Sequence, residues 1–483
     1  MRDPMSFHKP IPEPWQRSGL VERLRHCVCL SMWGVGLLVL ALPAETNRRP
    51  GPNVVLIYCD DLGYGDVGCY GSSIPTPNVD RLAAEGMMFT QFYSANPVCS
   101  PSRAALLTGR YPTRVGVPRV LFPKDTTGLP DDEMTIAQML KANGYKTMCV
   151  GKWHLGHLPR FLPTSRGFDE YFGIPYSNDM SPRPLMHNLE VLEEPAVLET
   201  LTPRYTEQAL RFIERSKDSP FFLYMPHTYP HIPLGASDRF RGKSAQGLYG
   251  DVIREIDWSV GQIVETLKRL GLENDTLVMF SSDNGPWYLG SPGKLRGRKG
   301  TTYEGGVREP FIARFPGRIP AGAVCKGVAG TVDILPTIAG LCNAKLPVKP
   351  LDGIDIWPLL SGRKDSIERE ALLYFDDWNV QCARWGRWKL HFMRYNVPPY
   401  VPVPQGGRMN LQLPAPELYD LEADPDESYD VAAENPKIVA AIQLRVERLL
   451  EGFPEEVRKA YREAKALQVE KTNAGQVPRL KKK

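Results

Sequence analysis

Two apolar stretches that end in acidic and amide side chains constrain the fold of this chain more than any other feature. The run PNVVLIYCDD, which starts at Pro52, ends in Asp60 and Asp61, and the run TLVMFSSDNG delivers Asp283 and Asn284. Continuous apolar runs rich in β-branched residues are typical of parallel strands that are buried on both faces. In open α/β sheets, ligands bind just beyond the carboxyl ends of such strands. The sequence therefore predicts an α/β protein whose functional side chains follow its strands.

Strand-like and helix-like segments alternate along most of the chain, which favours a large, mostly parallel sheet flanked by helices on both faces. Helices are expected over residues 78–86, 102–108, 135–143, 205–215 and 250–270. The pattern changes near residue 373, where short strand-like pieces at 371–375, 379–383 and 388–394 predict a smaller antiparallel sheet. A Pro-rich loop is expected over residues 398–416, and helical spacing follows over residues 436–468.

The first 44 residues have the order of a secretory signal peptide. Three arginines precede an apolar run over residues 27–42, and Pro43 and Ala44 follow it. The alternative is a single uncleaved anchor, because Leu42 stands two residues before the expected cleavage point. In both cases we expect an exported protein, periplasmic or secreted, or lysosomal if the source is eukaryotic. The remaining chain is expected in three parts: a main domain over 50–372, a C-terminal subdomain over 373–470 and a basic, disordered tail over 471–483.

The charge balance limits the classes of binding partner, and the cysteine count limits disulfide pairing. With 59 Lys and Arg against 55 Asp and Glu, the formal net charge is only +4, which offers no electrostatic footprint for nucleic acid. No stable membrane span is expected after signal cleavage, because the chain has no second long apolar run. Two of the nine cysteines lie in the signal segment, so an odd number remains and at least one is unpaired. The oligomeric state is not predicted.

Four polar clusters follow the predicted strands, and they should meet at one edge of the sheet. They are Asp60 with Asp61, Lys152 with His154, a loop holding His227 and His231, and Asp283 with Asn284. An isolated Asp-Asp pair is more often a loop or capping pair than a ligand pair. A second acid and amide pair after another buried strand favours a site for Ca²⁺ or Mg²⁺, which prefer oxygen ligands.

The segment NPVCSPSRAALLTGRYPTR places Cys99 at the start of a helix. Pro101 suits the first turn, Ser100 is expected to cap the helix, and Gly109 is expected to end it. At that position free backbone N–H groups favour an anion, and Arg103 lies one turn further on. From the residues alone, Cys99 and Arg103 are either structural or belong to a thiol nucleophile.

This segment resembles the sulfatase signature, in which the cysteine is oxidised to Cα-formylglycine, also called 3-oxoalanine. The resemblance extends along most of the chain and is nearest to the group that contains arylsulfatase A and N-acetylgalactosamine-6-sulfatase. It rests on CSPSR with AALLTGR, and on GKWHLG, RGFDEYFGIPYS, SSDNG, KGTTYEGGVREP and ELYDLEADPDE. The resemblance implies an alkaline-phosphatase-like fold and hydrolysis of sulfate monoesters in a carbohydrate or aryl sulfate. It also implies Ca²⁺ as the metal and a formylglycine-generating maturation enzyme as a partner.

The resemblance also assigns roles to single residues. The implied metal ligands are Asp60, Asp61, Asp283, Asn284 and residue 99. Of the two hydroxyls of the hydrated aldehyde, one attacks sulfur and the other loses its proton to His154, so that sulfate departs. The groups that hold the hydrate or the sulfate are implied to be Arg103, Lys152 and Ser177, and Lys299 is implied to contact the ester. His231, in the sequence His-Ile-Pro, is favoured over His227 as the group that protonates the leaving alcohol.

Two other functions remain open on the sequence. Phosphate-ester and phosphonate-ester hydrolases of the same superfamily place similar residues around one cation. A catalytically inactive, sulfatase-like carbohydrate-binding protein is the second alternative, and an unmodified Cys99 would favour it. Lys294 and Arg296 are expected at the substrate entrance, whereas Glu304, Arg308 and His391 are expected to make structural contacts.

Overall fold

The computed structural model describes residues 51–395 and 410–473. The predicted signal peptide and most of the predicted basic tail lie outside these residues. A helix extends to Asn473 and so includes the first residues assigned to that tail. Residues 49–483 form one compact unit, so the boundary expected near residue 372 stays a prediction.

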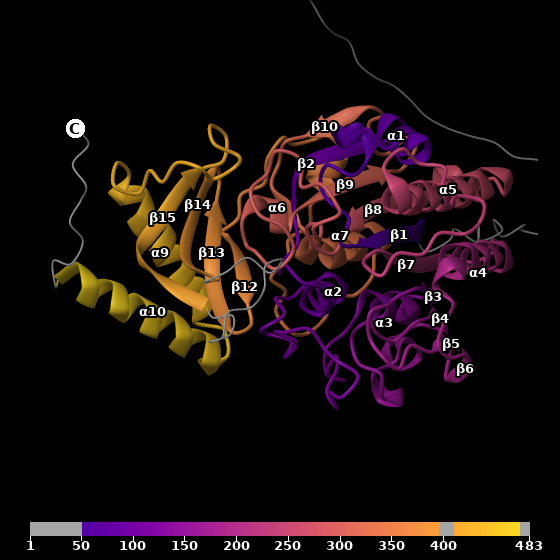
Figure 1. Ribbon diagram of the computed structural model, residues 1–483, viewed down its shortest axis with the longest axis horizontal. Helices are drawn as coiled ribbons and strands as arrows, with labels where there is room; N and C mark the ends of the chain where they lie inside the picture. Colours follow the sequence, from indigo (N-terminus) through magenta and orange to yellow (C-terminus); the bar gives the residue numbers. More distant parts are fainter. Residues whose placement is uncertain (1–50, 396–409, 474–483) are drawn as a thin grey trace, which may run out of the picture. The chain divides into compact units, whose positions relative to one another are not determined.

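The main sheet contains 11 strands and is mixed, with mostly parallel neighbours in its centre (Figure 1). Its order is β10-β2-β9-β8-β1-β7-β3-β4-β5-β6, and β11 also pairs with β2. The strands are β1 (Asn53–Asp60), β2 (Met87–Tyr93), β3 (Lys146–Val150), β4 (Glu170–Gly173), β5 (Leu185–His187), β6 (Glu190–Glu193), β7 (Phe221–Pro230), β8 (Thr276–Ser282), β9 (Arg308–Arg314), β10 (Ala323–Cys325) and β11 (Ala329–Gly330). The predicted α/β class and mostly parallel sheet are confirmed.

Helices cover both faces of this sheet, and the side chains of β1 show why. Val54, Leu56 and Tyr58 enter one hydrophobic cluster, and the alternate residues Val55 and Ile57 enter another. Because successive strand side chains point to opposite faces, an apolar residue at every position supports a core on each side. The first core includes residues of α2 (Cys99–Thr108), α3 (Ile136–Ala142), α7 (Ile334–Cys342) and α8 (Trp357–Leu360), and the second includes residues of α1 (Pro77–Ala84), α4 (Leu201–Arg215) and α5 (Gly247–Arg269).

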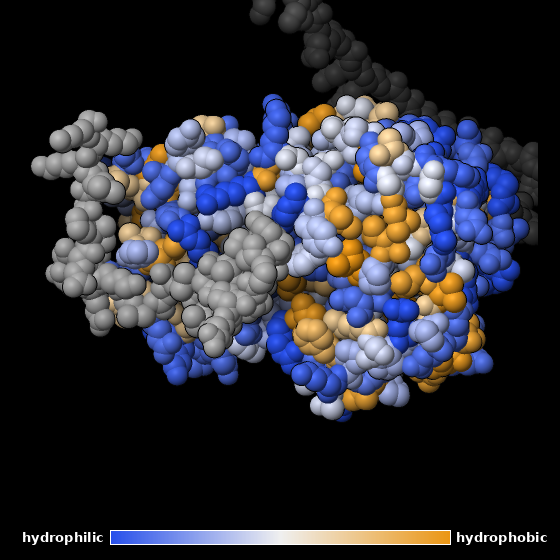
Figure 2. Space-filling model, viewed as in Figure 1, coloured by the Kyte–Doolittle hydropathy of each residue, from blue (hydrophilic) through white to orange (hydrophobic). Residues whose placement is uncertain are grey.

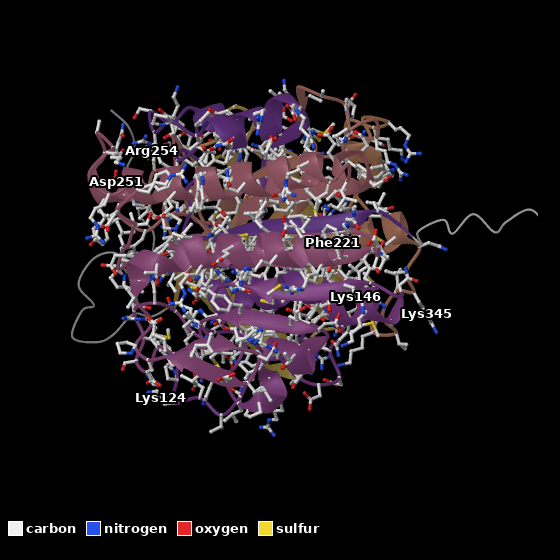
Figure 3. The ribbon with its side chains drawn as sticks, turned by 90° about the vertical axis from the view of Figure 1, so that its right-hand side faces the viewer. Lys124, Lys146, Phe221, Asp251, Arg254 and Lys345 are labelled. Atoms are coloured by element: carbon white, nitrogen blue, oxygen red, sulfur yellow. The ribbon has the colours of Figure 1, made fainter. Side chains whose placement is uncertain are left out.

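The strand register brings the carboxyl ends of β1, β3, β7 and β8 to one edge. Lys146 pairs with Phe221 at the amino ends of β3 and β7, and these two residues lie together on one side of Figure 3. Lys124, in the loop before α3, lies on the other side of the same view. The loops that follow the four strands therefore meet at a single edge, as the sequence predicts.

A second sheet of four antiparallel strands follows in the chain. Its strands are β12 (Leu372–Asp376), β13 (Asn379–Trp385), β14 (Trp388–Tyr395) and β15 (Asn410–Asp420). The predicted loop over 398–416 is wrong for its last residues, because β15 includes Pro414 and Pro416. Prolines lack a ladder donor and are tolerated on edge strands, and β15 is at the edge of this sheet. Residues 396–409 lie outside the described part.

The helices predicted over 436–468 are two in number, and the second extends a little further than predicted. They are α9 (Pro436–Leu450) and α10 (Glu455–Asn473). Pro454 precedes α10, and a proline disfavours helical geometry in the residue before it. The proline therefore explains the interruption. Buried side chains of both helices join residues of β12–β14 in a third hydrophobic cluster.

Several apolar side chains at the β5–β6 end of the main sheet are exposed. Leu189, Val191 and Leu192 are each about half exposed or more, and Figure 2 shows hydrophobic colour in this region. The seven cysteines from Cys59 to Cys382 form no disulfide with one another. Across the described residues, no helix combines the length and apolar character that a membrane crossing needs.

Candidate active site

The predicted metal-binding residues meet in a buried cluster. Asp60 ends β1, and Asp61 follows it with a left-handed φ of 63°. Asp283 and Asn284 come directly after β8, and Cys99 is the first residue of α2. All five side chains are buried. The positive φ at Asp61 turns the chain sharply after the strand, which brings two consecutive carboxylates into one cluster.

Four side chains offer ligand atoms that lie within 4.8 Å of one another: Asp60, Asp61, Cys99 and His231. Asp283 faces the same cluster, because its Oδ1 accepts a hydrogen bond from the Asp61 backbone N–H at 3.1 Å. Among the described atoms, the Oδ1 oxygens of Asp60 and Asn284 are buried without a hydrogen-bond partner. Buried oxygens without partners are costly, and a divalent cation would satisfy both. The donor set therefore fits an oxygen-binding metal.

Two buried cations and a third that is partly exposed, Lys299, balance the carboxylates. Arg103 donates from Nε and Nη2 to Asp283 Oδ2, at 3.0 and 2.8 Å, and from Nη1 to the Lys152 carbonyl. The Nζ of Lys152 contacts Asp60 Oδ2, and Lys299 Nζ lies 2.8 Å from the Asp61 carboxylate. Arg103 is thus fixed by its contact with Asp283. The two lysines instead contact Asp60 and Asp61, the carboxylates that lie close to Cys99.

The charges act on one another through a region from which water is largely excluded. Burial alone would raise the pKa of Asp60, but Lys152 foremost, with further nearby cations, holds that pKa well below its usual range. Burial would likewise lower the pKa of Lys299, but Asp61 raises it well above the usual value. Asp60 is therefore ionised and Lys299 is protonated at neutral pH.

His154 is oriented by a backbone carbonyl. Its Nε2 donates to the Leu121 carbonyl at 2.9 Å, and its Nδ1 is buried without a partner. Burial, with Lys152 and Arg103 nearby, lowers the pKa of His154 well below its usual value. A neutral ring that donates from Nε2 leaves Nδ1 as an acceptor. His154 can therefore accept a proton at Nδ1.

The structure separates the two candidate histidines, because His227 lies within β7 and His231 directly follows that strand. His231 Nδ1 donates to the Ile232 carbonyl at 2.5 Å, and its Nε2 lies 3.7 Å from Asp61 Oδ2. Both ring nitrogens of His227 are buried without partners, and burial lowers its pKa to about 3. His231 lies within the polar cluster, close to Ser177, whose Oγ accepts from Lys152 at 3.0 Å.

Cys99 sits at the helix start as expected, but the cap differs. The residue before the helix is Val98, and its side chain makes no capping hydrogen bond. Ser100 instead accepts a hydrogen bond from the Leu121 backbone N–H at 3.1 Å, so its predicted capping role is wrong. Gly109 ends the helix with a left-handed φ of 67°, as predicted. Burial raises the pKa of the Cys99 thiol to about 11, so an unmodified Cys99 is a neutral thiol at physiological pH.

The segment that carries Lys299, residues 296–308, which we call the 296–308 loop, is hydrogen-bonded and ion-paired to residues of the C-terminal sheet and to Glu427. Glu427 accepts from the Glu304 backbone N–H at 2.6 Å and from His391 Nε2 at 2.7 Å. Lys389 Nζ lies 2.9 Å from Glu304 Oε1 and 3.3 Å from Glu427 Oε1. These four side chains are fully or almost fully buried. The structural role expected for Glu304 and His391 is confirmed.

Arg296 is exposed and contacts the C-terminal part of the chain, and its place at a substrate entrance stays a prediction. Its Nη1 donates to the Glu427 carbonyl at 2.6 Å, and its guanidinium lies 4.1 Å from the Tyr303 ring centre. No signal in the sequence pointed to Glu427, or to the Leu121 carbonyl that orients His154. A backbone carbonyl can come from any residue type, and Glu427 follows several other acids in the same motif.

Buried carboxylates, two lysines and a proton-accepting histidine at the carboxyl edge of an α/β sheet form the kind of site that hydrolyses esters of oxyanions. Comparison with known proteins agrees. A model of the sulfatase family matches residues 52–344, and a model of the C-terminal region of aryl-sulfatase matches residues 367–477.

Individual relatives match over most of their length. The chain is 41% identical to human arylsulfatase A, over 84% of this chain and 89% of that protein. It is 42% identical to pig N-acetylgalactosamine-6-sulfatase, over 74% and 75% of the two chains. A solved structure from Bacteroides thetaiotaomicron, described under the metabolism of multiple glycosaminoglycans, has a TM-score of 0.74 and 29% identity. It is matched over 83% of this chain and 99% of that one.

The chain belongs to the sulfatase family. It is an arylsulfatase-like enzyme, a hydrolase of sulfate esters. A sulfated substrate follows from the family, and the fold agrees with that of its structural neighbours.

Proposed function

We propose that the enzyme hydrolyses sulfate monoesters through residue 99 oxidised to Cα-formylglycine, with one Ca²⁺ in each site. The observation that carries the proposal is the position of Cys99. It begins α2 beside Asp60, Asp61 and His231, within one buried polar cluster. As an unmodified neutral thiol, Cys99 would be a poor nucleophile.

The residues around position 99 suit both groups. Ca²⁺ would be held by residue 99 and the oxygens of Asp60, Asp61, Asp283 and Asn284, and would supply positive charge to polarise a sulfate oxygen. The hydrated aldehyde would supply two hydroxyls on one carbon, one to attack sulfur and one to lose a proton. Asp60 Oδ1 and Asn284 Oδ1, the buried oxygens without partners, support the metal assignment.

His154 has the geometry of a base. Its Nε2–H is fixed on the Leu121 carbonyl, so the proton it accepts goes to Nδ1. General bases of this kind contribute about 10² to 10⁴ in rate. We assign to His154 the removal of the hydroxyl proton whose loss releases sulfate.

Lys152 and Lys299 supply fixed positive charge for the sulfate group. Their ammonium groups contact Asp60 and Asp61 from different segments, Lys152 from the turn after β3 and Lys299 from the 296–308 loop. Preorganised charges in a buried site stabilise charge that develops during the reaction. Ser177 joins Lys152 at 3.0 Å. His231, when protonated, would donate from Nε2 to the ester oxygen as that oxygen leaves with the alcohol.

The favoured substrate is a sulfated carbohydrate, with simple aryl sulfates as surrogates. The names of two relatives support this choice, since one acts on N-acetylgalactosamine 6-sulfate and the other is arylsulfatase A. We also propose that a formylglycine-generating enzyme matures the chain, and that the chain is exported after cleavage of residues 1–44. N-terminal sequencing of protein from the native host tests the cleavage.

The decisive experiment is mass spectrometry of the tryptic peptide 82–103 from protein made in its native host. We expect the mass that corresponds to replacement of the Cys99 –CH₂–SH by an aldehyde, together with labelling by a hydrazide reagent. A Cys99→Ala variant is the control and should give neither signal. An intact thiol in native protein contradicts the mechanism and favours the inactive carbohydrate-binding alternative.

The phosphate-ester or phosphonate-ester alternative is tested on the same preparation. Matched aryl sulfate, phosphate and phosphonate esters share one leaving group, so the rates compare only the transferred group. We expect the highest kcat/KM for the sulfate. A higher value for the phosphonate would reassign the reaction while leaving the modified residue in place.

A further inference from the structure

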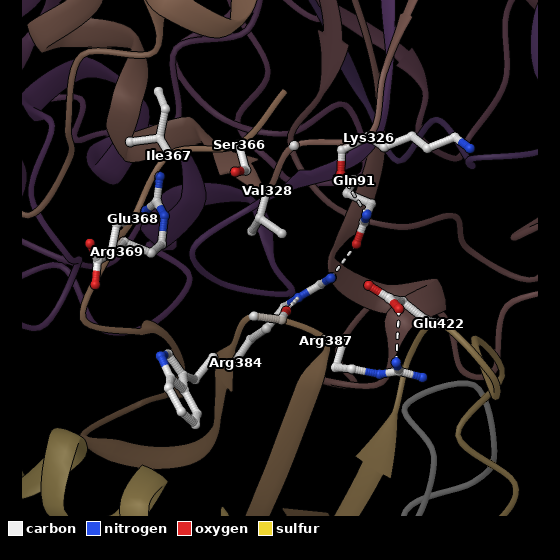
Figure 4. A pocket seen from close by; sticks show the side chains of 13 residues that line it. Gln91, Lys326, Val328, Ser366, Ile367, Glu368, Arg369, Arg384, Arg387 and Glu422 are labelled. Carbon is white, nitrogen blue, oxygen red and sulfur yellow. Dashed lines mark hydrogen bonds and ion pairs between the residues drawn. The ribbon is translucent and has the colours of Figure 1, made fainter. Parts of the chain in front are cut away.

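A second cavity lies between the edge of the main sheet and the C-terminal sheet (Figure 4). Its volume is about 390 Å³, within the range of sites that hold small molecules. Its walls are Gln91 of β2, residues 326–328 between β10 and β11, residues 366–369 before β12, residues 384–387 of the β13–β14 hairpin, and Glu422. None of these residues belongs to the site around Cys99.

Arg384 forms part of the wall and has no carboxylate partner of its own. Its side chain is 1% exposed. It donates to the Tyr93 hydroxyl, the Gln91 side-chain oxygen and the Gly386 carbonyl, which are all neutral acceptors. The carboxylate oxygen within ion-pair range of it in the described structure belongs to Glu304, at 3.9 Å. That oxygen also accepts from Tyr93 and contacts Arg308.

A buried cation without a close counter-ion is costly. Burial lowers the pKa of Arg384 to about 9, so the guanidinium still carries its charge at neutral pH. A guanidinium has five N–H donors, and the three neutral acceptors use three of them. An oxyanion in the cavity would meet the remaining donors and supply the missing negative charge.

Two more cations line the cavity with donors to spare. Arg369 is 9% exposed and donates from Nη2 to Asp333 at 2.6 Å, but its Nε is buried without a partner. Lys326 is exposed at the rim, and no carboxylate in the described part of the chain pairs with it. The wall thus has unused hydrogen-bond donors on Arg384 and Arg369, and Lys326 adds a positive charge at the rim.

The acidic residues of the wall offset these cations only in part, since Glu422 acts on Arg384 without contacting it. Glu422 lies 3.1 Å from Arg387 Nη1, the pair drawn in Figure 4. Glu368 is exposed and forms no ion pair with any described residue. Glu368 therefore opposes an anion in the cavity, and its removal should strengthen binding. An increase in anion affinity on removing Glu368 is diagnostic, because replacing a surface residue with only a structural role would not strengthen anion binding.

The rest of the wall is apolar. Trp385 is partly exposed and lies against the Arg445 guanidinium, which is 4.1 Å from its ring centre. Val328 and Ile367 also line the cavity (Figure 4). An aromatic and aliphatic wall beside oxyanion donors suits a compact ligand that has both a charged group and an apolar face. A sugar ring that carries sulfate or carboxylate has this chemistry.

We propose that this cavity, which we call the junction pocket, binds the sulfate or carboxylate group of an anionic saccharide unit, apart from the site of hydrolysis. The proposal is independent of the mechanism proposed above, because binding is measured without turnover. Both an anionic sugar and inorganic sulfate present an oxyanion to the pocket. The test must therefore distinguish binding of the sugar from binding of the free anion.

The test is calorimetric titration of the full chain carrying Cys99→Ala, which prevents turnover. The probes are N-acetylgalactosamine 6-sulfate, glucuronate, inorganic sulfate and unsulfated N-acetylgalactosamine. Lys326→Gln should weaken binding of the two anionic sugars about threefold or more, and Glu368→Gln should strengthen it by a similar factor. Both residues are exposed, so both variants should fold. Any binding at the Cys99 site is common to all chains and cancels in the comparison.

A third variant identifies the source of the oxyanion. Trp385→Ala should abolish the preference for anionic sugars over inorganic sulfate, because it removes the aromatic wall while leaving the cations. Equal affinity for inorganic sulfate and sugar sulfate in the parent chain would show a free-anion site and overturn the saccharide assignment. Unchanged affinities in both charge variants would overturn the junction pocket as an anion site. Hydrolysis of an aryl sulfate by the Lys326→Gln and Glu368→Gln chains with Cys99 intact should stay at the parent level.

Discussion

At the scale of single residues, one backbone contact decides which nitrogen of His154 can react. The Leu121 carbonyl accepts from Nε2, and Nδ1 is buried without a hydrogen-bond partner. The backbone N–H of Leu121 also donates a hydrogen bond to the Oγ of Ser100, the residue after Cys99. Leu121 therefore orients both the base and the first turn of the helix that carries the reactive position.

The first prediction concerns this base. His154→Gln should lower kcat by about 10² to 10³, because the amide has no basic nitrogen to accept the proton. KM for an aryl sulfate should change little, because the lysines that face the sulfate remain. Steady-state kinetics measures both constants. His157→Gln, a change in a nearby histidine that contacts Tyr176, is the matched control; a loss of less than tenfold at His154 would remove it from the base role.

Residue types at the strand ends were readable from the sequence, because buried parallel strands and the acids that follow them have distinct compositions. Asp60, Asp61, Asp283 and Asn284 meet where that argument places them. The partner of Arg103 was not readable. A guanidinium in such a motif can hold a substrate or an acid, and only the three-dimensional arrangement shows that Asp283 occupies it.

At the scale of elements, the 296–308 loop takes its position from a different sheet. Lys389 on β14 and Glu427 after β15 hold Glu304 at the start of α6 (Glu304–Val307). Lys299, on the same loop, reaches Asp61. The C-terminal sheet therefore contributes to the site by fixing the loop, although none of its described residues belongs to the cluster around Cys99.

Removal of the central cation tests this anchor. Lys389→Met should lower the free energy of unfolding by about 3–5 kcal/mol, because it removes the buried cation that two buried carboxylates share. Denaturant unfolding measures the loss. Lys345→Met, at an exposed lysine, is the control and should be near neutral. The double change Lys389→Met with Glu427→Gln should recover part of the loss; no recovery would argue against a charge effect.

The same cluster predicts a pH dependence. Burial would raise the pKa of Glu427, but Lys389 and the His391 hydrogen bond hold it at about 2, below its ordinary 4.5. A depressed carboxyl pKa stabilises the folded state above pH 4.5, and this stabilisation is lost as the pH falls towards 2. The contribution is on the order of 3 kcal/mol. Urea unfolding of the parent and of Glu427→Gln should therefore differ most at pH 6 and converge towards pH 2; a constant difference would contradict the assignment.

Most helices and the buried strands β1, β3, β7 and β8 were predictable, but β2, β9 and β15 were not. The sequence of β2, MMFTQFY, is short and follows a helix closely, so periodicity gives no separate signal. In β15, two prolines argue against a strand, and only its place at a sheet edge makes them acceptable. Strand position within a sheet is a tertiary property, which local sequence does not contain.

At the scale of the whole molecule, the order of the strands decides which side chains meet. Asp60 and Asp283 are far apart in the sequence, yet β1 and β8 are neighbours in register from Asn53 with Thr276 to Cys59 with Ser282. The general rule about carboxyl ends predicted convergence. The neighbour relation itself depends on packing among all the strands and was not predictable.

Because the metal would join three segments, its removal should weaken the whole fold. Dialysis against a chelator should lower the Tm, and Ca²⁺ at about 100 times its Kd should restore about 2.7 kcal/mol of stability. Differential scanning calorimetry measures the change without any substrate. Asp61→Asn should reduce the response to Ca²⁺, whereas Asp218→Asn, at an exposed position, should retain it. A Tm that changes neither on chelation nor on addition of Ca²⁺ would contradict a metal at this site.

The contact between Glu304 and Glu427 also limits how this enzyme can be recombined. The 296–308 loop and the C-terminal strands share one set of buried charges. A hybrid that takes its C-terminal region from a relative would bring a new partner to the old loop and leave a charge unmatched. A functional exchange therefore has to transfer the loop together with the distant strands. The two segments therefore have to be exchanged together, although more than a hundred residues separate them in the chain.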